Sequence, residues 1–329
     1  MKVLIVRTDR LGDLVLTLPM ASELKRANPN VSVSFLVHNY TRPIAERCPA
    51  IDKVISFEAT NSLWQNIRLF RASGCEVAVF PSPRWPLVLA AFLARIPVRI
   101  GTGYRWYSPL FNRRIRAHRR LGGLHEAVHN LRMLRSIGIE ADPQALPQVE
   151  LRDEEHSVAR EWLYATLPNA ADKFAVLHIS TAGSSKDWSL EHFVELANTM
   201  RSEFGLEIVL TGTEGDRELL ERAKNEIGAG VHLFVGKSLP ELAALLTKAS
   251  IVISNSTGPG HLAAAVGTPS VGLFPLPPAL ARERWGFRGT RAFNLAPEPI
   301  SGCPNCKVCT CMERILVRDV MEIIRSILS

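Results

Sequence analysis

The 329-residue sequence lacks the long apolar segments that membrane insertion requires. Its longest apolar stretch, Pro86 to Ala94, is far shorter than the roughly 20 residues of a membrane-spanning helix. The chain begins Met-Lys-Val-Leu-Ile-Val-Arg, and these apolar residues are too few for a signal peptide but typical of a first strand. We therefore expect a cytoplasmic protein that touches a membrane at most from its surface.

The sequence also lacks the standard glycine motifs of nucleotide-binding proteins. No G-x-G-x-x-G follows the first expected strand, and Gly101-Thr-Gly103 has no third glycine, which disfavours a nicotinamide dehydrogenase. Gly236-Lys-Ser238 resembles the end of a P-loop, but Val231 stands where the first glycine is needed. No Asp-x-Asp pair is present to hold a divalent cation on a diphosphate.

Charge is divided unevenly along a chain whose 47% hydrophobic and 22% charged residues are ordinary for a globular protein. Residues 1–150 hold 21 Lys and Arg against 11 Asp and Glu, a net charge of +10, whereas the remainder has a net charge of −3. Eight arginines lie between Arg95 and Arg120. This half suits a polyanionic partner such as nucleic acid, phospholipid or a phosphorylated glycolipid. A solvated arginine-rich face is the alternative.

Short apolar runs alternate with helix-periodic segments, which predicts parallel sheets covered by helices on both faces. The expected strands are Val3–Val6, Val31–Val37, Val54–Phe57, Val77–Phe80, Phe174–Ile179, Glu207–Leu210, Val231–Phe234, Ile251–Ile253 and Ser270–Phe274. The expected helices are Leu14–Lys25, Leu63–Ala72, Leu190–Glu203, Asp216–Ile227 and Leu239–Lys248. The pattern indicates an α/β fold of two doubly wound, Rossmann-like domains, residues 1–168 and 169–329, facing a central cleft. Residues 101–148 are expected to be irregular except for a helix near Glu126–Ile137. The last helix, Val317–Leu328, is expected to pack back across the domain junction.

The segment Ser254-Asn-Ser-Thr-Gly-Pro-Gly-His261 is the most informative stretch of the chain. It joins the apolar run Ile251–Ile253 to Leu262-Ala-Ala-Ala-Val266, which favours a helix. A strand, a tight turn and a helix start bring unpaired N–H groups and a positive helix end together, which suits a phosphate. An ordinary strand-to-helix loop would have the same outline.

Asp13 follows the first expected strand, in the turn Arg7-Thr-Asp-Arg-Leu-Gly-Asp13. Gly12 permits a tight turn and places Asp13 where the helix begins. Aspartate is favoured as a helix N-cap, so a capping role is one interpretation. A carboxylate at this position could instead remove the proton from an attacking hydroxyl. One residue could do both.

Two further loops at strand ends carry polar residues. Ser180–Ser189 is rich in hydroxyl groups and contains Lys186, so it offers N–H groups, hydroxyls and one positive charge to a diphosphate. Thr211-Gly-Thr-Glu214-Gly-Asp216 ends another strand with two carboxylates. An acid here commonly binds ribose hydroxyls, and an N-terminal helix cap is the equal alternative.

Four cysteines lie within nine residues: Cys303, Cys306, Cys309 and Cys311. In a cytoplasmic chain such a cluster indicates metal ligands rather than disulfides. The spacing C-x2-C-x2-C-x-C departs from the paired C-x2-C knuckle, so one tetrahedral site would be cramped. A zinc or iron site and reduced thiols in a structured loop both remain open.

Several of these motifs together resemble glycosyltransferase family 9, the bacterial lipopolysaccharide heptosyltransferases and their relatives. The motifs are Leu-Gly-Asp13 with Pro19 behind it, Lys186-x-Trp188, Gly236-Lys-Ser-Leu239 and Ser256-Thr-Gly258-x-x-His261-Leu-Ala-Ala-Ala265. They occur in order along the whole chain, and Cys306-Lys-Val-Cys309-Thr-Cys311 resembles the cysteine-bearing tail of many members. The family's heptosyltransferases typically carry an acid where this chain has Ser256, which leaves the donor open.

The resemblance implies a GT-B fold, a nucleotide-diphospho-sugar donor in the C-terminal half, and metal-independent inverting transfer with Asp13 as the general base. The candidate donor-binding residues are Thr181, Ser185, Lys186, Glu214, Asp216, Lys237, Asn255, Ser256, Thr257, Gly258 and His261. From the charge of the first half, the candidate acceptor-binding residues are Arg10, Arg105, Arg113, Arg114 and Arg116.

We therefore expect an inverting glycosyltransferase on the inner face of the cytoplasmic membrane. Its first candidate donor is ADP-heptose, and its acceptor is a lipopolysaccharide core or a related anionic lipid-linked saccharide. No cofactor is expected for catalysis, with structural zinc or iron confined to the cysteine cluster. The alternatives are a nucleotide-sugar epimerase on the same scaffold and a basic nucleic-acid-binding protein with a metal-bound tail. Nucleic acid is not expected as a partner, because no recognition module is discernible.

Overall fold

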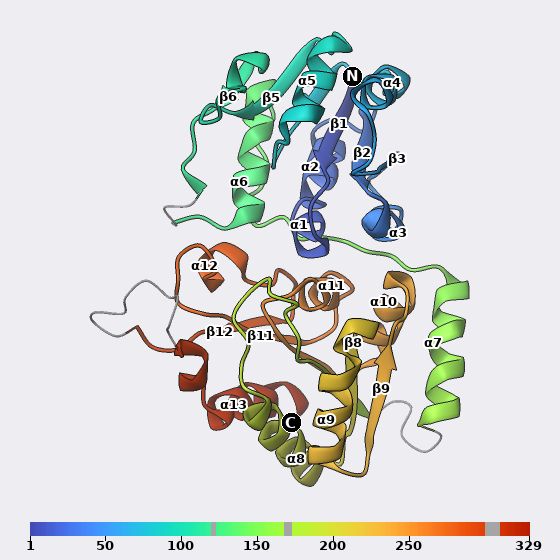
Figure 1. The fold of residues 1–329 in the computed structure, drawn as a ribbon, viewed down its shortest axis with the longest axis vertical. Coiled ribbons are helices and arrows are strands. Elements are labelled where there is room, and N and C mark those ends of the chain that lie inside the picture. Colours follow the sequence, from blue (N-terminus) through green and yellow to red (C-terminus); the bar gives the residue numbers. More distant parts are fainter. Residues whose placement is uncertain (120–122, 168–172, 300–309) are drawn as a thin grey trace. The chain divides into compact units, whose positions relative to one another are not determined.

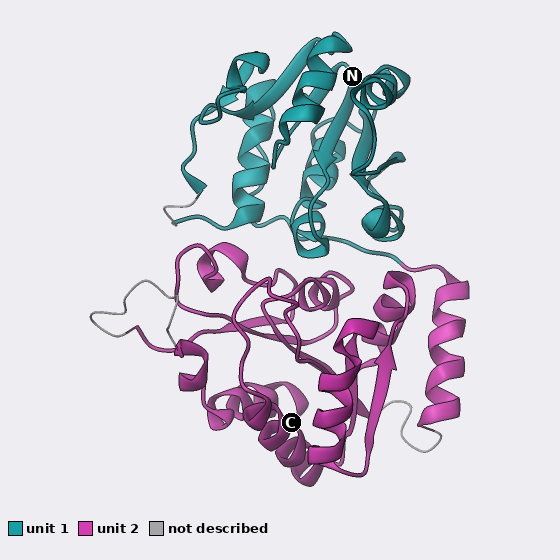
Figure 2. Cartoon of the chain, in the orientation of Figure 1, with its two compact units in different colours: residues 1–150 teal, residues 151–329 magenta. Residues whose placement is uncertain are grey.

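The computed structural model describes residues 1–119, 123–167, 173–299 and 310–329, which form two compact units (Figure 2). Unit 1 comprises residues 1–150 and unit 2 comprises residues 151–329. The predicted boundary after residue 168 was therefore too late, because helix α7 (Asp153–Thr166) belongs to unit 2. There α7 packs against α10 (Leu239–Lys248), and Trp162 meets Phe234 edge to face with ring centroids 4.9 Å apart.

Unit 1 is a six-stranded parallel sheet between helices (Figure 1). Its strands are β1 (Lys2–Arg7), β2 (Ser32–His38), β3 (Lys53–Phe57), β4 (Val77–Val79), β5 (Val98–Thr102) and β6 (Arg113–Ile115), in the order β3-β2-β1-β4-β5-β6. Its α-helices are α1 (Leu11–Val15), α2 (Pro19–Ala27), α3 (Arg42–Ala45), α4 (Leu63–Ser73), α5 (Trp85–Leu93) and α6 (Glu126–Arg132). The single helix predicted over Leu14–Lys25 is divided, and Pro19 begins its second part because proline suits the first turn of a helix.

Unit 2 repeats this architecture with a second six-stranded parallel sheet. Its strands are β7 (Phe174–His178), β8 (Glu207–Gly212), β9 (Val231–Val235), β10 (Ile251–Asn255), β11 (Ser270–Leu273) and β12 (Ala292–Leu295), in the order β12-β11-β10-β7-β8-β9. Its other helices are α8 (Leu190–Phe204), α9 (Arg217–Ile227), α11 (Gly258–Ala265), α12 (Arg282–Trp285) and α13 (Val317–Leu328). Both units thus have the Rossmann order, which confirms the predicted fold class.

The strand order reverses at one place in each sheet, between β1 and β4 in unit 1 and between β7 and β10 in unit 2. Loops that leave neighbouring strands in opposite directions open a crevice at the carboxyl ends of those strands, where doubly wound sheets bind ligands. The motif at Asp13 follows β1, and the motifs at Lys186 and His261 follow β7 and β10. Sequence and topology therefore select the same two places.

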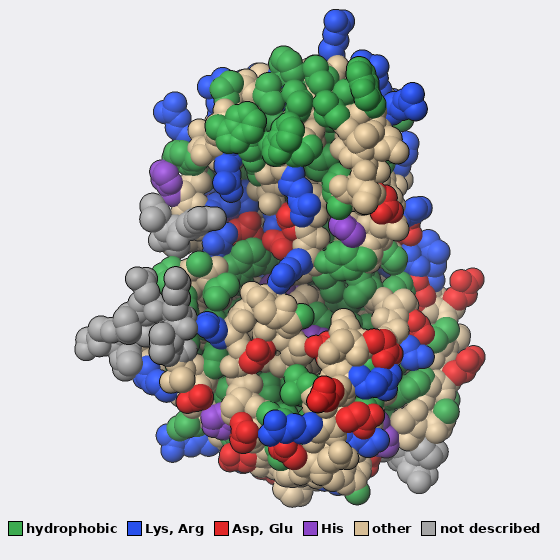
Figure 3. Space-filling model, viewed as in Figure 1, with side chains coloured by type: hydrophobic (Ala, Val, Ile, Leu, Met, Phe, Trp, Pro, Cys, Tyr) green, Lys and Arg blue, Asp and Glu red, His purple; other side chains and the backbone are tan. Residues whose placement is uncertain are grey.

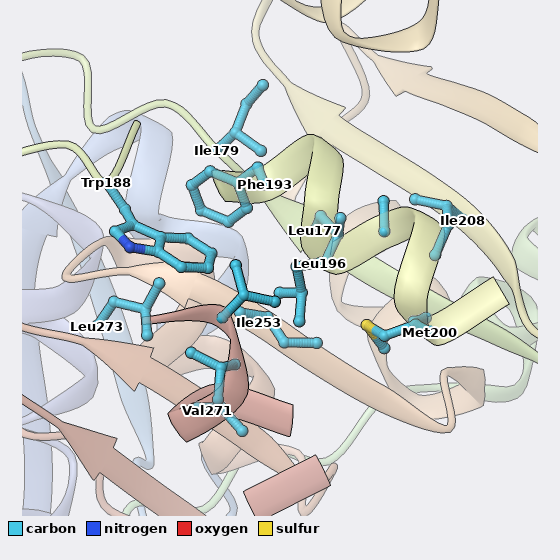
Figure 4. Packing of buried hydrophobic residues seen from close by; sticks show 14 of the residues in the cluster. Leu177, Ile179, Trp188, Phe193, Leu196, Met200, Ile208, Ile253, Val271 and Leu273 are labelled. Atoms are coloured by element: carbon cyan, nitrogen blue, oxygen red, sulfur yellow. The ribbon is translucent and has the colours of Figure 1, made fainter. Parts of the chain in front are cut away.

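The core of unit 2 extends into the loop that precedes α8. Trp188 is 2% exposed and packs edge to face on Phe193, with ring centroids 4.9 Å apart, within the cluster drawn in Figure 4. Its indole Nε1 donates a hydrogen bond of 2.9 Å to the carbonyl of Ile315. The loop is therefore anchored by a large buried side chain.

Helix α13 packs against α8 of its own unit. Its buried Val320, Met321 and Ile324 belong to the unit 2 core, and Arg325 pairs with Glu203 of α8 at 2.6 Å. These contacts lie within unit 2, and packing of this helix across the domain junction stays a prediction. The sequence pattern shows that one face of the helix is apolar but does not show which core that face packs against.

Residues 101–148 are more regular than we predicted. β6 pairs in parallel with β5, with Ile100 opposite Arg113. A 3-10 turn, Ser108–Leu110, precedes β6, and another, Met133–Ile137, follows α6. Phe111 anchors the segment, since a Cβ at Gly101 would lie 2.2 Å from the Phe111 ring. The short, arginine-rich β6 has no apolar alternation, so its strand character depends on pairing with β5.

Candidate functional site

Asp13 lies just beyond the carboxyl end of β1, in the first turn of α1. The N-cap of α1 is Arg10, and the Asp13 carboxylate pairs with the guanidinium of Arg7, the last residue of β1. Asp13 is therefore not the cap that one interpretation proposed. Its side chain is 20% exposed, so a ligand can reach it from one side.

A buried guanidinium is the centre of this unit 1 site. Arg7 is 2% exposed and interacts with three carboxylates. It pairs with Asp13, lies 3.2 Å from Asp9 through Nε, and lies 3.8 Å from Glu126 through a terminal nitrogen. Arg84, which precedes α5, approaches Asp9 at 3.6 Å. The loops after β1 and β4 therefore meet at the point where the strand order reverses.

A second layer of contacts holds this cluster in place. Glu126 pairs with Arg119, which also donates to the side chain of Asn130 at 2.9 Å. Asn130 donates to Thr17 at 3.1 Å, and the Thr17 hydroxyl donates to the backbone carbonyl of Asp13 at 2.7 Å. Helix α6 thus supports the turn that presents Asp13, although more than 100 residues separate them in sequence.

The surroundings of Asp13 raise the pKa of its carboxyl group. Burial raises the pKa of the Asp13 carboxyl, and the negative charges of Asp9 and Glu126 raise it further, whereas Arg7 opposes the shift without cancelling it. Burial alone would lower the pKa of Arg7, but the surrounding carboxylates outweigh burial and raise it. Asp13 therefore holds a proton more readily than an exposed aspartate while remaining paired with a fixed cation.

The predicted acceptor residues lie on the surface of unit 1 in several places. Arg10 is exposed beside Asp13, and Arg113 and Arg114 are exposed on the edge strand β6. Arg116, just beyond β6, and Arg105 are exposed as well. Successive residues of a strand point to opposite faces, so Arg113 and Arg114 do not share one surface.

In unit 2, the loop after β7 turns sharply before Lys186. Ala182 and Gly183 have positive φ values of 45° and 72°, and the Asp187 carboxylate accepts a 3.0 Å bond from the Thr181 N–H. Lys186 is half-buried. The buried hydroxyl oxygen of Ser185 has no hydrogen-bond partner among the described residues. The loop therefore offers one cation and one unpaired hydroxyl.

Asn255, the last residue of β10, joins this loop to the sheet. Its amide oxygen accepts from the Trp188 N–H at 3.0 Å, and its amide nitrogen donates to the Ile179 carbonyl at 2.8 Å. Asn255 is fully buried, so its side chain is occupied in positioning the Lys186 loop. The sequence pattern selected this residue as a ligand contact, and the structure gives it a supporting role.

The turn between β10 and α11 forms the other part of the unit 2 site. Thr257 is the N-cap of α11 but makes no side-chain capping bond, because its hydroxyl lies 2.7 Å from that of Ser254. Ser256 and Gly258 are half-buried at the same turn. The N-cap side chain thus leaves the first N–H groups of α11 uncapped, as anion binding requires.

His261 lies in the first turn of α11 and is 4% exposed. Its ring meets Phe287 edge to face with centroids 4.8 Å apart. Phe287 lies so close to the helix that a Cβ at Gly260 would be 2.1 Å from it. The glycine of the motif is therefore required for packing, and this packing fixes the imidazole.

The remaining donor candidates lie at the ends of β8 and β9. Asp216 accepts from the N–H and hydroxyl of Thr213 at 2.8 and 2.6 Å, as in the capping interpretation. Burial alone would raise the pKa of Asp216, but hydrogen bonds from Ser180 and Thr213 lower it. Glu214 is exposed, pairs with Arg217 at 2.8 Å and covers Gly236, where a Cβ would lie 2.2 Å from it. Exposed Lys237 lies over the Phe234 ring at 6.0 Å.

A buried histidine that the sequence reading missed lies beneath these residues. His178 ends β7, and its Nδ1 lies 2.9 Å from the Thr211 hydroxyl. Burial lowers the pKa of His178 to about 4, although the charge of Asp216 opposes the shift. The imidazole is therefore neutral near pH 7. The other residues missed, Arg7, Glu126 and Asn130, could have been suspected only as polar residues in otherwise apolar segments.

The predicted metal ligands Cys303, Cys306 and Cys309 lie outside the described residues. Cys311 is described and is 1% exposed in the core of unit 2. Within the ranges that the structure covers, no three His, Cys, Asp or Glu side chains are grouped as a metal site. Burial raises the pKa of Cys48 to about 11, so this isolated thiol is protonated.

Comparison with known proteins identifies the family of this chain. A sequence model of glycosyltransferase family 9 (heptosyltransferase) matches residues 86–280. A Haemophilus influenzae protein assigned as a glycosyltransferase is 28% identical over 320 residues, covering 92% of this chain and 89% of that protein. Lipopolysaccharide heptosyltransferase 3 of Escherichia coli is 26% identical over 278 residues, covering 80% of each chain.

Solved structures show the same fold. A family 9 glycosyltransferase from Veillonella parvula superposes with a TM-score of 0.86 at 20% identity, covering 99% of this chain and 97% of that one. The E. coli ADP-heptose lipopolysaccharide heptosyltransferase II superposes with a TM-score of 0.77 at 19% identity, covering 100% and 98%. The two Rossmann-like units are thus a GT-B fold. The family match extends over more than half of the sequence, and the chain belongs to glycosyltransferase family 9, the heptosyltransferase family.

Proposed function

We propose that this glycosyltransferase moves a sugar, with heptose as the first candidate, from a nucleoside diphosphate to an anionic, lipid-linked saccharide, with inversion at the anomeric carbon. The observation that carries the proposal is the Asp13 carboxylate, whose raised pKa and fixed partner Arg7 suit a general base. The motifs of unit 2 supply the donor side.

In the proposed reaction Asp13 removes the proton from an acceptor hydroxyl as its oxygen attacks the anomeric carbon of the donor. The new glycosidic bond forms on the face opposite the departing diphosphate, and the bond from the anomeric carbon to the phosphate oxygen breaks. The proton stays on Asp13 until solvent removes it. Arg7 keeps the carboxylate ionised before the reaction and orients it, since its guanidinium is buried and cannot move away.

Unit 2 would hold the donor diphosphate and stabilise the negative charge that grows on it. The candidate groups are the Lys186 ammonium, the Ser185 hydroxyl, the Thr257 hydroxyl and the first N–H groups of α11. Preorganised donors of this kind stabilise a transition state without having to reorient. We propose that they make a divalent cation unnecessary, so activity should persist in EDTA.

Two solved relatives suggest a donor to test first. E. coli heptosyltransferase structures were determined with ADP and with ADP-2-deoxy-2-fluoro heptose, and they superpose on this chain with TM-scores of 0.74 and 0.72 at 20% identity. We propose ADP-heptose by this analogy. Ser256 stands where heptosyltransferases of the family typically carry an acid, so other nucleotide sugars belong in the same test.

The proposal is tested by thermal shift against ADP-heptose and a panel of ADP-, UDP- and GDP-sugars, followed by a transfer assay. With the stabilising donor and a lipopolysaccharide-core acceptor, nucleoside diphosphate should be released only when both substrates are present. Recovery of the sugar as an epimer on its nucleotide would instead indicate an epimerase. Retention on DNA without stabilisation by any nucleotide sugar would contradict a glycosyltransferase function.

The acceptor and the membrane are the remaining partners. The net charge of +10 on unit 1 and its exposed arginines support an acceptor with phosphate or carboxylate groups. A lipid-linked acceptor requires the enzyme to work at a membrane surface, and we propose peripheral attachment at the cytoplasmic face. Among the described helices, none is both long and apolar enough to cross a bilayer.

A further inference from the structure

Helix α5 of unit 1 has a surface that the proposed chemistry does not use. Its sequence, Trp85-Pro-Leu-Val-Leu-Ala-Ala-Phe-Leu93, contains no polar side chain. One side of the helix is buried in the core of unit 1, but Trp85, Phe92 and Leu93 are 50%, 43% and 40% exposed. A helix that is apolar all round is normally covered all round. Among the residues that the structure describes, none covers the exposed side of α5 as expected.

The exposed apolar residues of α5 line one side of the helix, and two more tryptophans lie on segments that contact it. Trp85, Leu89, Phe92 and Leu93 are spaced so that they lie along one side of the helix. Trp106 is 78% exposed, and its ring centroid lies 6.2 Å from that of Trp85. On α4, which packs against α5, Trp64 is 72% exposed. We call the set Trp64, Trp85, Leu89, Phe92, Leu93 and Trp106 the aromatic face. Figure 3 shows hydrophobic side chains gathered over this part of unit 1, with Lys and Arg around them.

The segment that carries all of the aromatic face except Trp64 has charged residues of one sign only. Residues 77–125 contain nine arginines and no Asp or Glu. Arg99 lies over the Phe92 ring at 5.3 Å, and Arg95 at the end of α5 is exposed. Arg68 and Arg71 are exposed on α4. Tryptophan with arginine is the combination that favours the headgroup region of an anionic bilayer.

A second copy of this chain is a poorer occupant than a bilayer. A symmetric dimer through the aromatic face would bring the same surface of both copies together. The arginines beside each face would then meet arginines, and like charges across an interface are costly. An anionic lipid surface instead offers phosphates to the arginines and an apolar layer to the rings.

The start of the aromatic face lies near the Asp13 site. Trp64, Trp85 and Trp106 follow the carboxyl ends of β3, β4 and β5, on the edge of the sheet where Asp13 follows β1. Arg84, the residue before Trp85, approaches Asp9 at 3.6 Å, and Asp9 lies 3.2 Å from Arg7. The three tryptophans therefore lie toward the edge of the sheet that carries the proposed base, whereas Phe92 and Leu93 lie at the far end of α5.

We propose that the aromatic face is a membrane-docking surface, whose apolar side chains enter the headgroup region of an anionic bilayer while the neighbouring arginines bind lipid phosphates. The benefit to a lipid-linked acceptor rests on the proposed function, but docking itself does not. Docking needs neither donor nor acceptor.

The test is flotation of the full chain with vesicles of phosphatidylcholine alone or mixed equally with phosphatidylglycerol. The test variant combines Trp85→Ser, Phe92→Ser and Leu93→Ser. The matched control combines Tyr164→Ser, Leu219→Ser and Phe293→Ser, which are 66%, 37% and 37% exposed in unit 2. Wild type and control should bind the anionic vesicles, and the test variant should bind at least about tenfold more weakly. Vesicles without anionic lipid should bind wild type less.

Equal binding by the test and control variants would overturn the proposal, as would wild type that stays in solution with both vesicle types. Brominated lipids provide a second readout, because tryptophans at the aromatic face should be quenched in wild type. A circular dichroism spectrum and a thermal unfolding midpoint like those of the wild type would show that the test variant is folded. Failure to bind vesicles with intact transfer to a delipidated acceptor would refute docking alone. Vesicle binding without any transfer would instead refute the proposed function.

Discussion

Units 1 and 2 share one strand order but have opposite chemistry where that order reverses. In unit 1 the reversal point holds ionised groups, with Arg7 buried among Asp9, Asp13 and Glu126. In unit 2 it holds mainly neutral groups, with the Asn255 amide bonded to the backbone and Ser254 bonded to Thr257. Unit 1 has a net charge of +10 and unit 2 of −3.

The difference indicates how one fold can serve two tasks. A buried cluster of charges can change its protonation state, so unit 1 is suited to moving a proton. A network of amides and hydroxyls keeps its state and its geometry, so unit 2 is suited to holding an anion at a helix start. In the proposed function, the two tasks follow from the loops at the reversal points rather than from the sheets, which are alike.

The largest expected effect is on turnover when the unit 1 carboxylate is neutralised. Asp13→Asn should lower turnover by roughly 10²- to 10⁴-fold, the usual contribution of a general base. The exposed Asp142→Asn is a control in the same unit and should leave turnover unchanged. A folded Asp13→Asn enzyme with near-normal turnover would reduce Asp13 to a structural partner of Arg7.

The pH dependence of the wild-type rate also tests whether Asp13 is the general base. The base works only when ionised, and the pKa of Asp13 is raised above its ordinary value of 3.8. Activity should therefore be lost as the pH falls through this raised pKa, at a higher pH than an exposed aspartate would give. Arg7→Lys keeps a cation beside Asp13, so activity should be lost at about the same pH as in wild type. Arg7→Met removes the cation, so activity should be lost at a higher pH.

The next largest expected effect is on donor binding in unit 2. Lys186→Ala should weaken nucleotide-sugar binding by about 10- to 150-fold, since a charge-assisted contact contributes about 1.5–3 kcal/mol. Lys248→Ala provides a control, because Lys248 is exposed at the C-terminal end of α10. Calorimetry with the donor and with the free nucleoside separates the contacts. An equal loss for both ligands would place Lys186 away from the phosphates.

A stability effect should distinguish the units under mild acid. The pKa of His178 is lowered to about 4 in the folded protein, so the unfolded chain takes up a proton near pH 6.5 and the folded chain does not. Unit 2 should therefore lose stability as the pH falls from about 6.5 to about 4, by about 2 kcal/mol between pH 7 and pH 5.

Hydrogen exchange of β7 peptides at pH 7 and pH 5, corrected for intrinsic exchange rates, measures this loss. His178→Asn retains a polar contact with Thr211 but has no group that titrates in this range, so its pH dependence should be flatter. The same slope in the variant and the wild type would assign the acid sensitivity to other groups.

The smallest expected effect is on the acceptor. Replacing Arg113, Arg114 and Arg116 together with glutamine should raise the acceptor KM several-fold and leave the donor Kd unchanged. The acceptor KM should also rise with ionic strength, because exposed charges are screened over roughly 8 Å at physiological salt. An acceptor KM that responds to neither change would make these arginines a solvated face.

The sequence predicted most of the strands because buried parallel strands such as β1 and β10 are apolar runs followed by turns. It did not predict β6, whose arginines have no apolar alternation and whose strand depends on β5. It also placed α7 in the wrong unit, since an amphipathic helix near a boundary does not reveal which core it covers. Within the candidate sites, Asp13 and Lys186 were identified from their turns. Arg7 and Glu126 were missed because they meet only after folding.

The central claim is that unit 1 supplies the base while unit 2 holds the donor. The donor Kd of Asp13→Asn, measured by calorimetry beside that of wild type, tests this division most directly. The account predicts donor affinities that agree within about twofold, although turnover of the variant falls at least 10²-fold. Donor affinity that falls in parallel with turnover would contradict it, because Asp13 would then belong to the donor site.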